Sequence, residues 1–193
     1  MSLRHVQIGV ITTYDAVNEK VEEMVRELAR ELVARKCVVI TGGNGGLMKI
    51  LAEEISHLNG ICVGILPGEL EELSYSHPLK HYYNTIEIRT GMSYAARSSI
   101  VVRSSDAIIL VAGGAGTLTE LAMAYNMAVP VIVLESSGML ASKLRSLFPD
   151  GYLDHRKIVK LEYARTPREA VEMAYVRAIE RLKVLGLSEV EVR

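Results

Sequence analysis

The sequence predicts one α/β domain, a doubly wound parallel sheet with helices on both faces, and three observations lead to this fold class. Short apolar runs alternate with helical patterns along the 193 residues. Runs such as 107–111 are apolar at every position, which is typical of strands buried on both faces. Two of the runs end in glycine-rich turns that lead into helices. No repeat, low-complexity tract or linker indicates a second domain, so we expect residues 1–193 to form a single one.

Each element is predicted from its periodicity. Runs of apolar and β-branched residues indicate strands, and apolar residues three and four positions apart indicate helices. The strands are expected at residues 6–11, 37–41, 61–66, 85–88, 107–111, 131–134 and 158–161. The helices are expected at residues 16–34, 47–58, 93–103, 117–127, 139–147 and 167–184. The last helix opens with Thr166, Pro167 and Glu169 in the pattern of a capping box with proline at the first helical position.

The turn after the strand at 107–111 carries the strongest functional signal. Residues 111–120 read Val-Ala-Gly-Gly-Ala-Gly-Thr-Leu-Thr-Glu. The first N–H groups of a helix lack intrahelical partners, and the helix dipole places about half a positive charge there, so an anion is favoured. The alternative is a capping box, in which Thr117 and Glu120 only satisfy each other's backbone N–H groups. The predicted phosphate-binding residues of this turn are Gly113, Gly114, Ala115, Gly116 and Thr117.

A second turn of the same kind spans residues 41–48, Thr-Gly-Gly-Asn-Gly-Gly-Leu-Met. In parallel sheets the carboxyl ends of the strands share one edge, where ligands bind, so the two turns predict one shared cleft. The predicted ligand-binding residues here are Gly42, Gly43, Asn44, Gly45 and Gly46.

Neither turn is a complete nucleotide fingerprint. Residues 41–48 lack the Gly-Lys-Ser/Thr ending of a P-loop, and Thr119 stands where a dinucleotide motif has its third glycine. Glu135 does follow at the end of the next strand, where an acid would bind a ribose. A dinucleotide site is therefore a lower-ranked alternative.

Two further segments are expected at the same edge of the sheet. The long connection from 67 to 84 carries tyrosines between Tyr75 and Tyr83 that could stack on a base, although a loop packed by its own tyrosines fits equally well. Arg97 lies in the first turns of a helix, where a cation opposes the helix dipole. A role in holding a phosphate or in orienting Glu120 would explain an arginine at this position. An arginine that is simply exposed to solvent would need no explanation.

Composition limits the classes of function. A formal net charge of −1 gives no preference for nucleic acid or for membranes, and no apolar run is long enough to span a bilayer. Without a signal segment at the start, we expect a cytoplasmic protein. Cys37 and Cys62 each open an apolar strand and lack metal-ligand spacing, so no metal site is expected.

Four blocks in a fixed order resemble the LOG-like Rossmann family, once labelled lysine decarboxylases. They are Gly-Gly-x-Gly-Gly-Leu-Met at 42–48, Gly-Ile-Leu-Pro at 64–67, Gly-Met-x-x-x-Ala-Arg at 91–97 and Gly-Gly-x-Gly-Thr-x-x-Glu at 113–120. The resemblance implies cleavage of the N-glycosidic bond of nucleoside 5′-monophosphates. It assigns catalysis to Arg97 and Glu120 and adds Met92 to the nucleotide-binding residues. The same fold includes molybdenum-cofactor carrier proteins.

Several positions depart from the LOG pattern. LOG enzymes usually have proline where this chain has Ala112, and lysine where it has Ser98. Many relatives have Gly-Ser in the first loop, where this chain has Thr12 and Thr13, which are expected to contact a ligand. These differences favour the carrier-like branch. The old decarboxylase label would require a pyridoxal phosphate lysine. Neither Lys49 nor Lys143 has a suitable context for one, so this cofactor is not expected.

Two functions remain open at this point. The protein is either a nucleoside 5′-monophosphate phosphoribohydrolase, which releases free base and ribose 5-phosphate, or a carrier that binds a phosphorylated ligand such as molybdenum cofactor without reaction. A homodimer or higher homo-oligomer is expected as well, since the resemblance implies it and two helices are small or apolar on more than one face. The residues concerned are Ala95, Ala96, Ala122, Met123, Ala124 and Met127.

Overall fold

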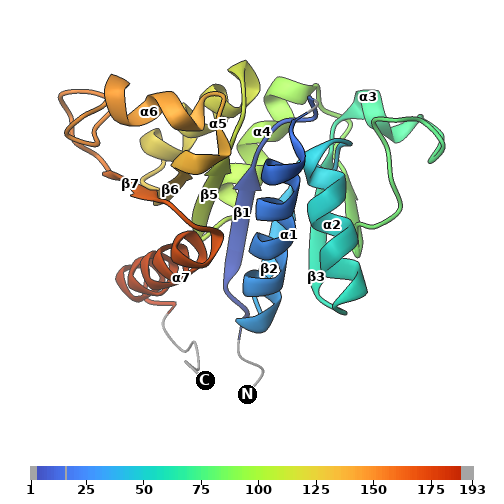
Figure 1. Cartoon of the computed structure of the whole chain (residues 1–193), viewed down its shortest axis with the longest axis horizontal. Coiled ribbons are helices and arrows are strands. Elements are labelled where there is room, and N and C mark those ends of the chain that lie inside the picture. The colour runs from blue at the N-terminus through green and yellow to red at the C-terminus, as the bar shows by residue number, and fades with distance from the viewer. Residues whose placement is uncertain (1–3, 16, 188–193) are drawn as a thin grey trace.

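The computed structural model describes residues 4–15 and 17–187. Within them, a seven-stranded sheet has the strand order β4-β3-β2-β1-β5-β6-β7, with every neighbouring pair parallel (Figure 1). The chain builds outward from β1 to β4 and then crosses back to β5. The strands are β1 (Gln7–Ile11), β2 (Val38–Thr41), β3 (Ile61–Leu66), β4 (Ile86–Arg89), β5 (Ala107–Val111), β6 (Val131–Leu134) and β7 (Leu161–Ala164).

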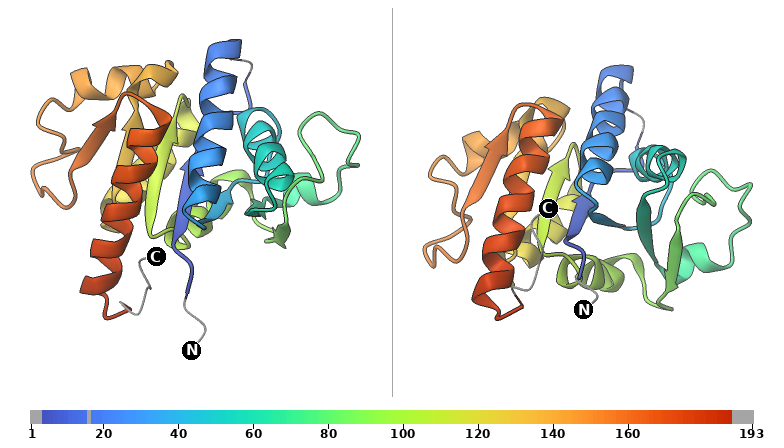
Figure 2. Two further views of the ribbon diagram at one scale, coloured as in Figure 1. Left: turned by 60° about the horizontal axis from the view of Figure 1, so that its bottom comes forward. Right: turned by 90° about the horizontal axis from the view of Figure 1, so that it is seen from below.

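Helices cover both faces of this sheet, which confirms the predicted doubly wound α/β fold (Figure 2). Alternate residues of β5 show the reason: Ile109 packs into the core under α1, α2 and α7, and Ile108 packs into the core under α4, α5 and α6. The helices are α1 (Glu19–Ala34), α2 (Leu47–His57), α3 (Gly68–Glu71), α4 (Tyr94–Arg103), α5 (Ala115–Asn126), α6 (Ala141–Leu147) and α7 (Pro167–Val184), with a short 3-10 helix η1 (Glu135–Ser137).

Some predicted boundaries were wrong, each for a local reason. The last strand was expected at 158–161 but begins at Leu161, because the Ile158 N–H donates to the Tyr125 hydroxyl (3.2 Å) outside the sheet. The first helix begins at Glu19, because the Asn18 side chain accepts from Val21 N–H and caps it there. Its predicted start at residue 16 lies outside the described residues. The short helices α3 and η1 were not predicted.

The start of α7 confirms half of its predicted capping box. Thr166 Oγ1 accepts from Glu169 N–H (3.2 Å), as expected for an N-cap. The Glu169 carboxylate accepts from Arg165 N–H (2.8 Å), one residue before the position that a capping box requires.

Among the residues that the structure describes, no helix is long and apolar enough to cross a membrane.

Candidate functional site

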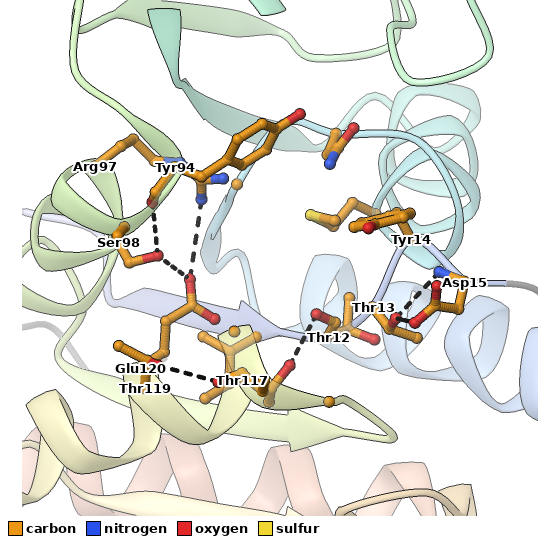
Figure 3. A pocket seen from close by; sticks show the side chains of 18 of the residues that line it. Thr12, Thr13, Tyr14, Asp15, Tyr94, Arg97, Ser98, Thr117, Thr119 and Glu120 are labelled. Carbon is orange, nitrogen blue, oxygen red and sulfur yellow. Dashed lines mark hydrogen bonds and ion pairs between the residues drawn. The ribbon is translucent and has the colours of Figure 1, made fainter. Parts of the chain in front are cut away.

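A cavity of about 380 Å³ opens where the strand order reverses between β1 and β5, in the range typical of small-molecule sites. Its wall comes from four segments: the loop after β1, the turn after β2, the start of α4 and the start of α5 (Figure 3). The glycine-rich turns thus meet at one cleft, as the sequence predicts. The polar and aromatic residues of the wall are Thr12, Thr13, Tyr14, Asp15, Asn44, Tyr94, Arg97, Ser98, Thr117, Thr119 and Glu120.

The start of α5 faces open space. Gly114 caps this helix without a side-chain hydrogen bond, and a Cβ added at Gly114 or Gly116 would meet no atom within 4 Å. Four successive residues of this turn, 114–117, line the cavity. A helix start of this kind favours a phosphate.

The alternative interpretation of Thr117 and Glu120 as a capping box was wrong. Thr117 Oγ1 donates to the Thr12 carbonyl oxygen (3.0 Å), which ties α5 to the end of β1. Glu120 accepts a hydrogen bond from Ser98 on α4 instead of reaching back to the helix start. Both side chains are therefore used for the cavity wall and not for the helix terminus.

The turn after β2 differs from the turn before α5, although their sequences look alike. Gly43 N–H donates to Thr41 Oγ1 (3.0 Å) and Gly45 N–H donates to the Leu79 carbonyl (3.0 Å). Gly46 has φ of +62°, and a Cβ there would lie 2.4 Å from the Tyr14 backbone. Glycine is therefore needed at position 46, because the backbone there packs closely against the backbone of Tyr14.

Of this turn, Gly42 and Asn44 line the cavity, and Gly43, Gly45 and Gly46 do not. Gly113 also lies outside the lining, with φ of +91° and Thr117 beside the position of a Cβ. Of the residues predicted to bind a phosphate or nucleotide, those that line the cavity therefore lie mainly at the start of α5.

Arg97 and Glu120 meet inside the cavity. Arg97 is 5% exposed and Glu120 is 8% exposed. Arg97 Nη1 lies 3.9 Å from Glu120 Oε1, and Ser98 Oγ donates to the same oxygen at 2.9 Å (Figure 3). The two residues that the family resemblance assigned to catalysis thus lie together as one buried pair.

Burial sets the electrostatics of this pair. It raises the pKa of Glu120, while the Ser98 hydroxyl and the Arg97 charge oppose the rise. It lowers the pKa of Arg97, against the attraction of Glu120. Within the described residues, Arg97 Nε and Thr12 Oγ1 are buried without a hydrogen-bond partner. Each such unpaired group costs about 1–3 kcal/mol of folding free energy.

Sequence reasoning missed several residues of the wall: Tyr14, Asp15, Met48 and Tyr94. Thr12 and Thr13 were predicted from the first loop, and both line the cavity. Their immediate successors could have been included, because residues that follow a parallel strand lie at the ligand-binding edge of the sheet.

The tyrosines of the loop before β4 do not reach the cavity. The Tyr75 hydroxyl donates to Glu87 (2.9 Å), and the Tyr82 and Tyr83 rings pack together with centroids 4.7 Å apart. None of them lines the cavity, and neither does Met92. The interpretation of this loop as packed by its own tyrosines is therefore the better one.

Within the described part of the chain, no group of three or more His, Cys, Asp or Glu side chains is placed to hold a metal ion. The exposed residues of α4 and α5 include Ala95, Ala96 and Leu118, and self-association through these helices stays a prediction.

Comparison with known proteins identifies the family of this chain. A protein of Archaeoglobus fulgidus without an assigned function is 39% identical over 124 residues, which cover 64% of this chain and 76% of that protein. A probable cytokinin riboside 5′-monophosphate phosphoribohydrolase of Oryza sativa subsp. japonica is 34% identical over 125 residues, 64% of this chain and 49% of that protein. The chain thus matches about half the length of the rice protein.

The fold is also similar to that of a solved structure, the molybdenum cofactor binding protein of Rippkaea orientalis. The TM-score is 0.70 and the identity 25%, with 91% of this chain and 98% of that chain covered. A model of the SLOG cluster4 family matches residues 5–171, and these include both glycine turns, Arg97 and Glu120. The chain therefore belongs to the SLOG cluster4 family, a LOG-like family with a Rossmann fold.

Proposed function

We propose that the protein binds a nucleoside 5′-monophosphate and hydrolyses its N-glycosidic bond to free base and ribose 5-phosphate. One observation carries the proposal: a buried carboxylate faces the same cavity as an open helix start. Gly116 and Glu120 are four residues apart on α5, about 6 Å along the helix axis. A phosphate on the first turn would therefore place the attached ribose near Glu120.

The phosphate would accept hydrogen bonds from the backbone N–H groups at the start of α5. The open space at Gly114 and Gly116 lets a phosphate oxygen approach this backbone without displacing a side chain. Arg97 and Thr12 line the same cavity, and a small shift of either side chain would offer its unpaired donor to ligand oxygens.

Glu120 would act on the charge that develops during the reaction. As the bond between C1′ and the base nitrogen breaks, its electron pair leaves with the base and positive charge develops on the ribose. An ionised carboxylate, held in place before the reaction, stabilises that charge. Water then forms the new bond to C1′ and loses a proton, and the base takes up a proton. Arg97 favours the ionised form of Glu120 throughout.

A second function uses the same cavity without chemistry. The protein would then carry a phosphorylated ligand such as molybdenum cofactor. Ser98 and Ala112 favour this alternative, because they replace the lysine and proline that LOG enzymes usually have. The similarity to the Rippkaea orientalis protein supports it as well.

Product analysis separates the two functions. The purified protein is incubated with AMP, GMP, CMP and UMP, and free base and ribose 5-phosphate are measured by chromatography and mass spectrometry. We expect release of both from at least one nucleotide. Glu120→Gln should lower kcat about a hundredfold or more, because it removes a preorganised charge.

Glu135→Gln is the matched control. Glu135 lies outside the cavity and pairs with Arg145 on the surface, so turnover should not change. Tight binding of a nucleotide without release of base would favour the carrier. Full turnover by Glu120→Gln would refute the role given to this carboxylate.

A further inference from the structure

We propose that Tyr14 and Tyr94 form the ring-binding part of the cavity and hold a planar heteroaromatic ring, a nucleobase or a pterin, between them. The inference rests on the proposed function only for the position of the phosphate at the start of α5. It gives a binding surface to the base or pterin ring, the part of the ligand for which the glycine-rich turns provide none.

Both tyrosines line the cavity from separate segments. Tyr14 belongs to the loop after β1, and Tyr94 is the first residue of α4. Figure 3 shows the two rings on opposite sides of the open part of the cavity, with Thr117 and Glu120 at its other end. The order of helix start, carboxylate and aromatic rings matches the order of phosphate, ribose and base in a nucleotide.

The backbones that carry these rings are fixed. Leu47 N–H donates to the Thr13 carbonyl (3.2 Å), and Thr13 Oγ1 donates to Asp15 Oδ2 (2.7 Å). Tyr94 N–H donates to Glu69 Oε1 (3.3 Å) on α3. Aromatic rings on fixed backbones lose little freedom when a ligand binds, which favours their use as stacking surfaces.

The surroundings of the rings suit an aromatic ligand. Tyr14 is 55% exposed, so its side chain is accessible to a ligand. Met48 is buried and lines the same cavity, and its flexible apolar side chain adapts to different ring shapes. Tyr82 is even more exposed, at 70%, but it lies outside the cavity. A high exposed fraction alone therefore does not identify a tyrosine as part of the ring-binding site.

The test compares ligands with and without a ring. Formycin 5′-monophosphate is a fluorescent AMP analogue whose C–C glycosidic bond resists hydrolysis, so it reports binding even if the protein is an active hydrolase. Neopterin monophosphate is the pterin probe, and ribose 5-phosphate is the ligand without a ring. Dissociation constants are measured for the wild type and for Tyr14→Ala, Tyr94→Ala, Tyr14→Phe and Tyr82→Ala.

Stacking on an aromatic side chain contributes about 1–3 kcal/mol per base, which corresponds to about a fivefold to 150-fold change in affinity. We expect losses of this size for the ring-bearing ligand with Tyr14→Ala and Tyr94→Ala. Ribose 5-phosphate should bind these variants as it binds the wild type. Tyr14→Phe keeps the ring and should keep the affinity, and Tyr82→Ala should change nothing.

Three results would overturn the proposal. If Tyr14→Ala and Tyr94→Ala lose as much affinity for ribose 5-phosphate as for the ring-bearing ligand, the tyrosines only maintain the fold of the site. If Tyr82→Ala loses affinity for the ring-bearing ligand and Tyr14→Ala does not, the ring binds at the loop before β4. Wild-type protein that binds neither ring-bearing ligand more tightly than ribose 5-phosphate would show that no ring site exists. Binding as expected, with no base released from AMP, would refute only the hydrolase.

Discussion

Ser98 provides the sharpest test of how Glu120 is controlled. Its hydroxyl donates to Glu120 Oε1 at 2.9 Å inside the protein, and Ser98→Ala removes that donor while leaving the Arg97 pair. The hydrogen bond favours the ionised carboxylate, so its loss raises the pKa of Glu120 further. A hydrogen bond to a charged group contributes about 1.5–3 kcal/mol, which corresponds to roughly a tenfold to 150-fold change in an equilibrium constant.

The sign of the effect on activity follows from this shift. If hydrolysis needs ionised Glu120, kcat/KM rises as the pH rises through the pKa of that group. Ser98→Ala should therefore move this rise to higher pH. At a fixed pH on the rising part of the profile, kcat/KM should fall by about tenfold or more, and on the plateau at higher pH it should change little.

The assay is the pH profile of kcat/KM for release of base, measured for the wild type, Ser98→Ala and Ser99→Ala. Ser99 is the matched control, because its hydroxyl donates to the Ala96 carbonyl (2.7 Å) within α4. Its substitution should leave the profile in place. An equal loss at every pH in Ser98→Ala would show that Ser98 only supports the structure, and an unchanged profile would refute its control of Glu120.

Two further substitutions separate function from stability. Gly42→Ala would place a Cβ 2.3 Å from Arg97 Nη1, so we expect the arginine to shift and kcat/KM to fall about a hundredfold, with an unchanged far-ultraviolet circular dichroism spectrum. Normal turnover would show that the arginine position is not needed. Ala112→Pro cannot adopt the φ of +52° at this position and loses the N–H that donates to Ser137 Oγ (2.7 Å). The free energy of unfolding, measured by chemical denaturation, should fall by about 3 kcal/mol or more, and a stable variant would contradict the left-handed conformation.

Most of the fold was predictable because the central strands of the sheet are buried on both faces. The run 107–111 is β5 with the expected boundaries, since every residue in it is apolar and buried. The strand β7 lies at the edge of the sheet, where burial is less complete. Its start is decided by two hydrogen bonds to residues outside the strand, from Ile158 N–H to Tyr125 and from Leu161 N–H to Gly151. The pattern of apolar residues within the strand predicts neither bond.

The candidate site was predictable in its main residues but not in its details. Arg97 and Glu120 stood out by their places on two helices, the family resemblance assigned them to catalysis, and the structure brings them together. The two glycine turns could not be told apart from sequence, because the same residue type serves an open helix start at Gly116 and a tight chain crossing at Gly46. The distinction depends on the backbone of Tyr14, which approaches only in the folded chain.

The two departures from the LOG pattern have different structural consequences. Ala112 adopts a left-handed conformation in which its carbonyl and that of Gly113 accept from Ala141 and Leu140 N–H groups, both at 3.1 Å. The turn therefore joins the start of α6 and leaves the start of α5 facing the cavity. Proline cannot adopt this left-handed conformation, so alanine at position 112 is compatible with this turn and proline is not.

Ser98 changes the charge balance instead. A neutral hydroxyl contacts Glu120 where a LOG enzyme usually has lysine, so the pKa of Glu120 stays raised by burial, with Arg97 as the cation that opposes the rise. A hydrolase and a carrier can share every group that holds the phosphate and still differ in the charge of this one carboxylate. Catalysis should therefore rise with pH over a range in which binding of a phosphorylated ligand does not.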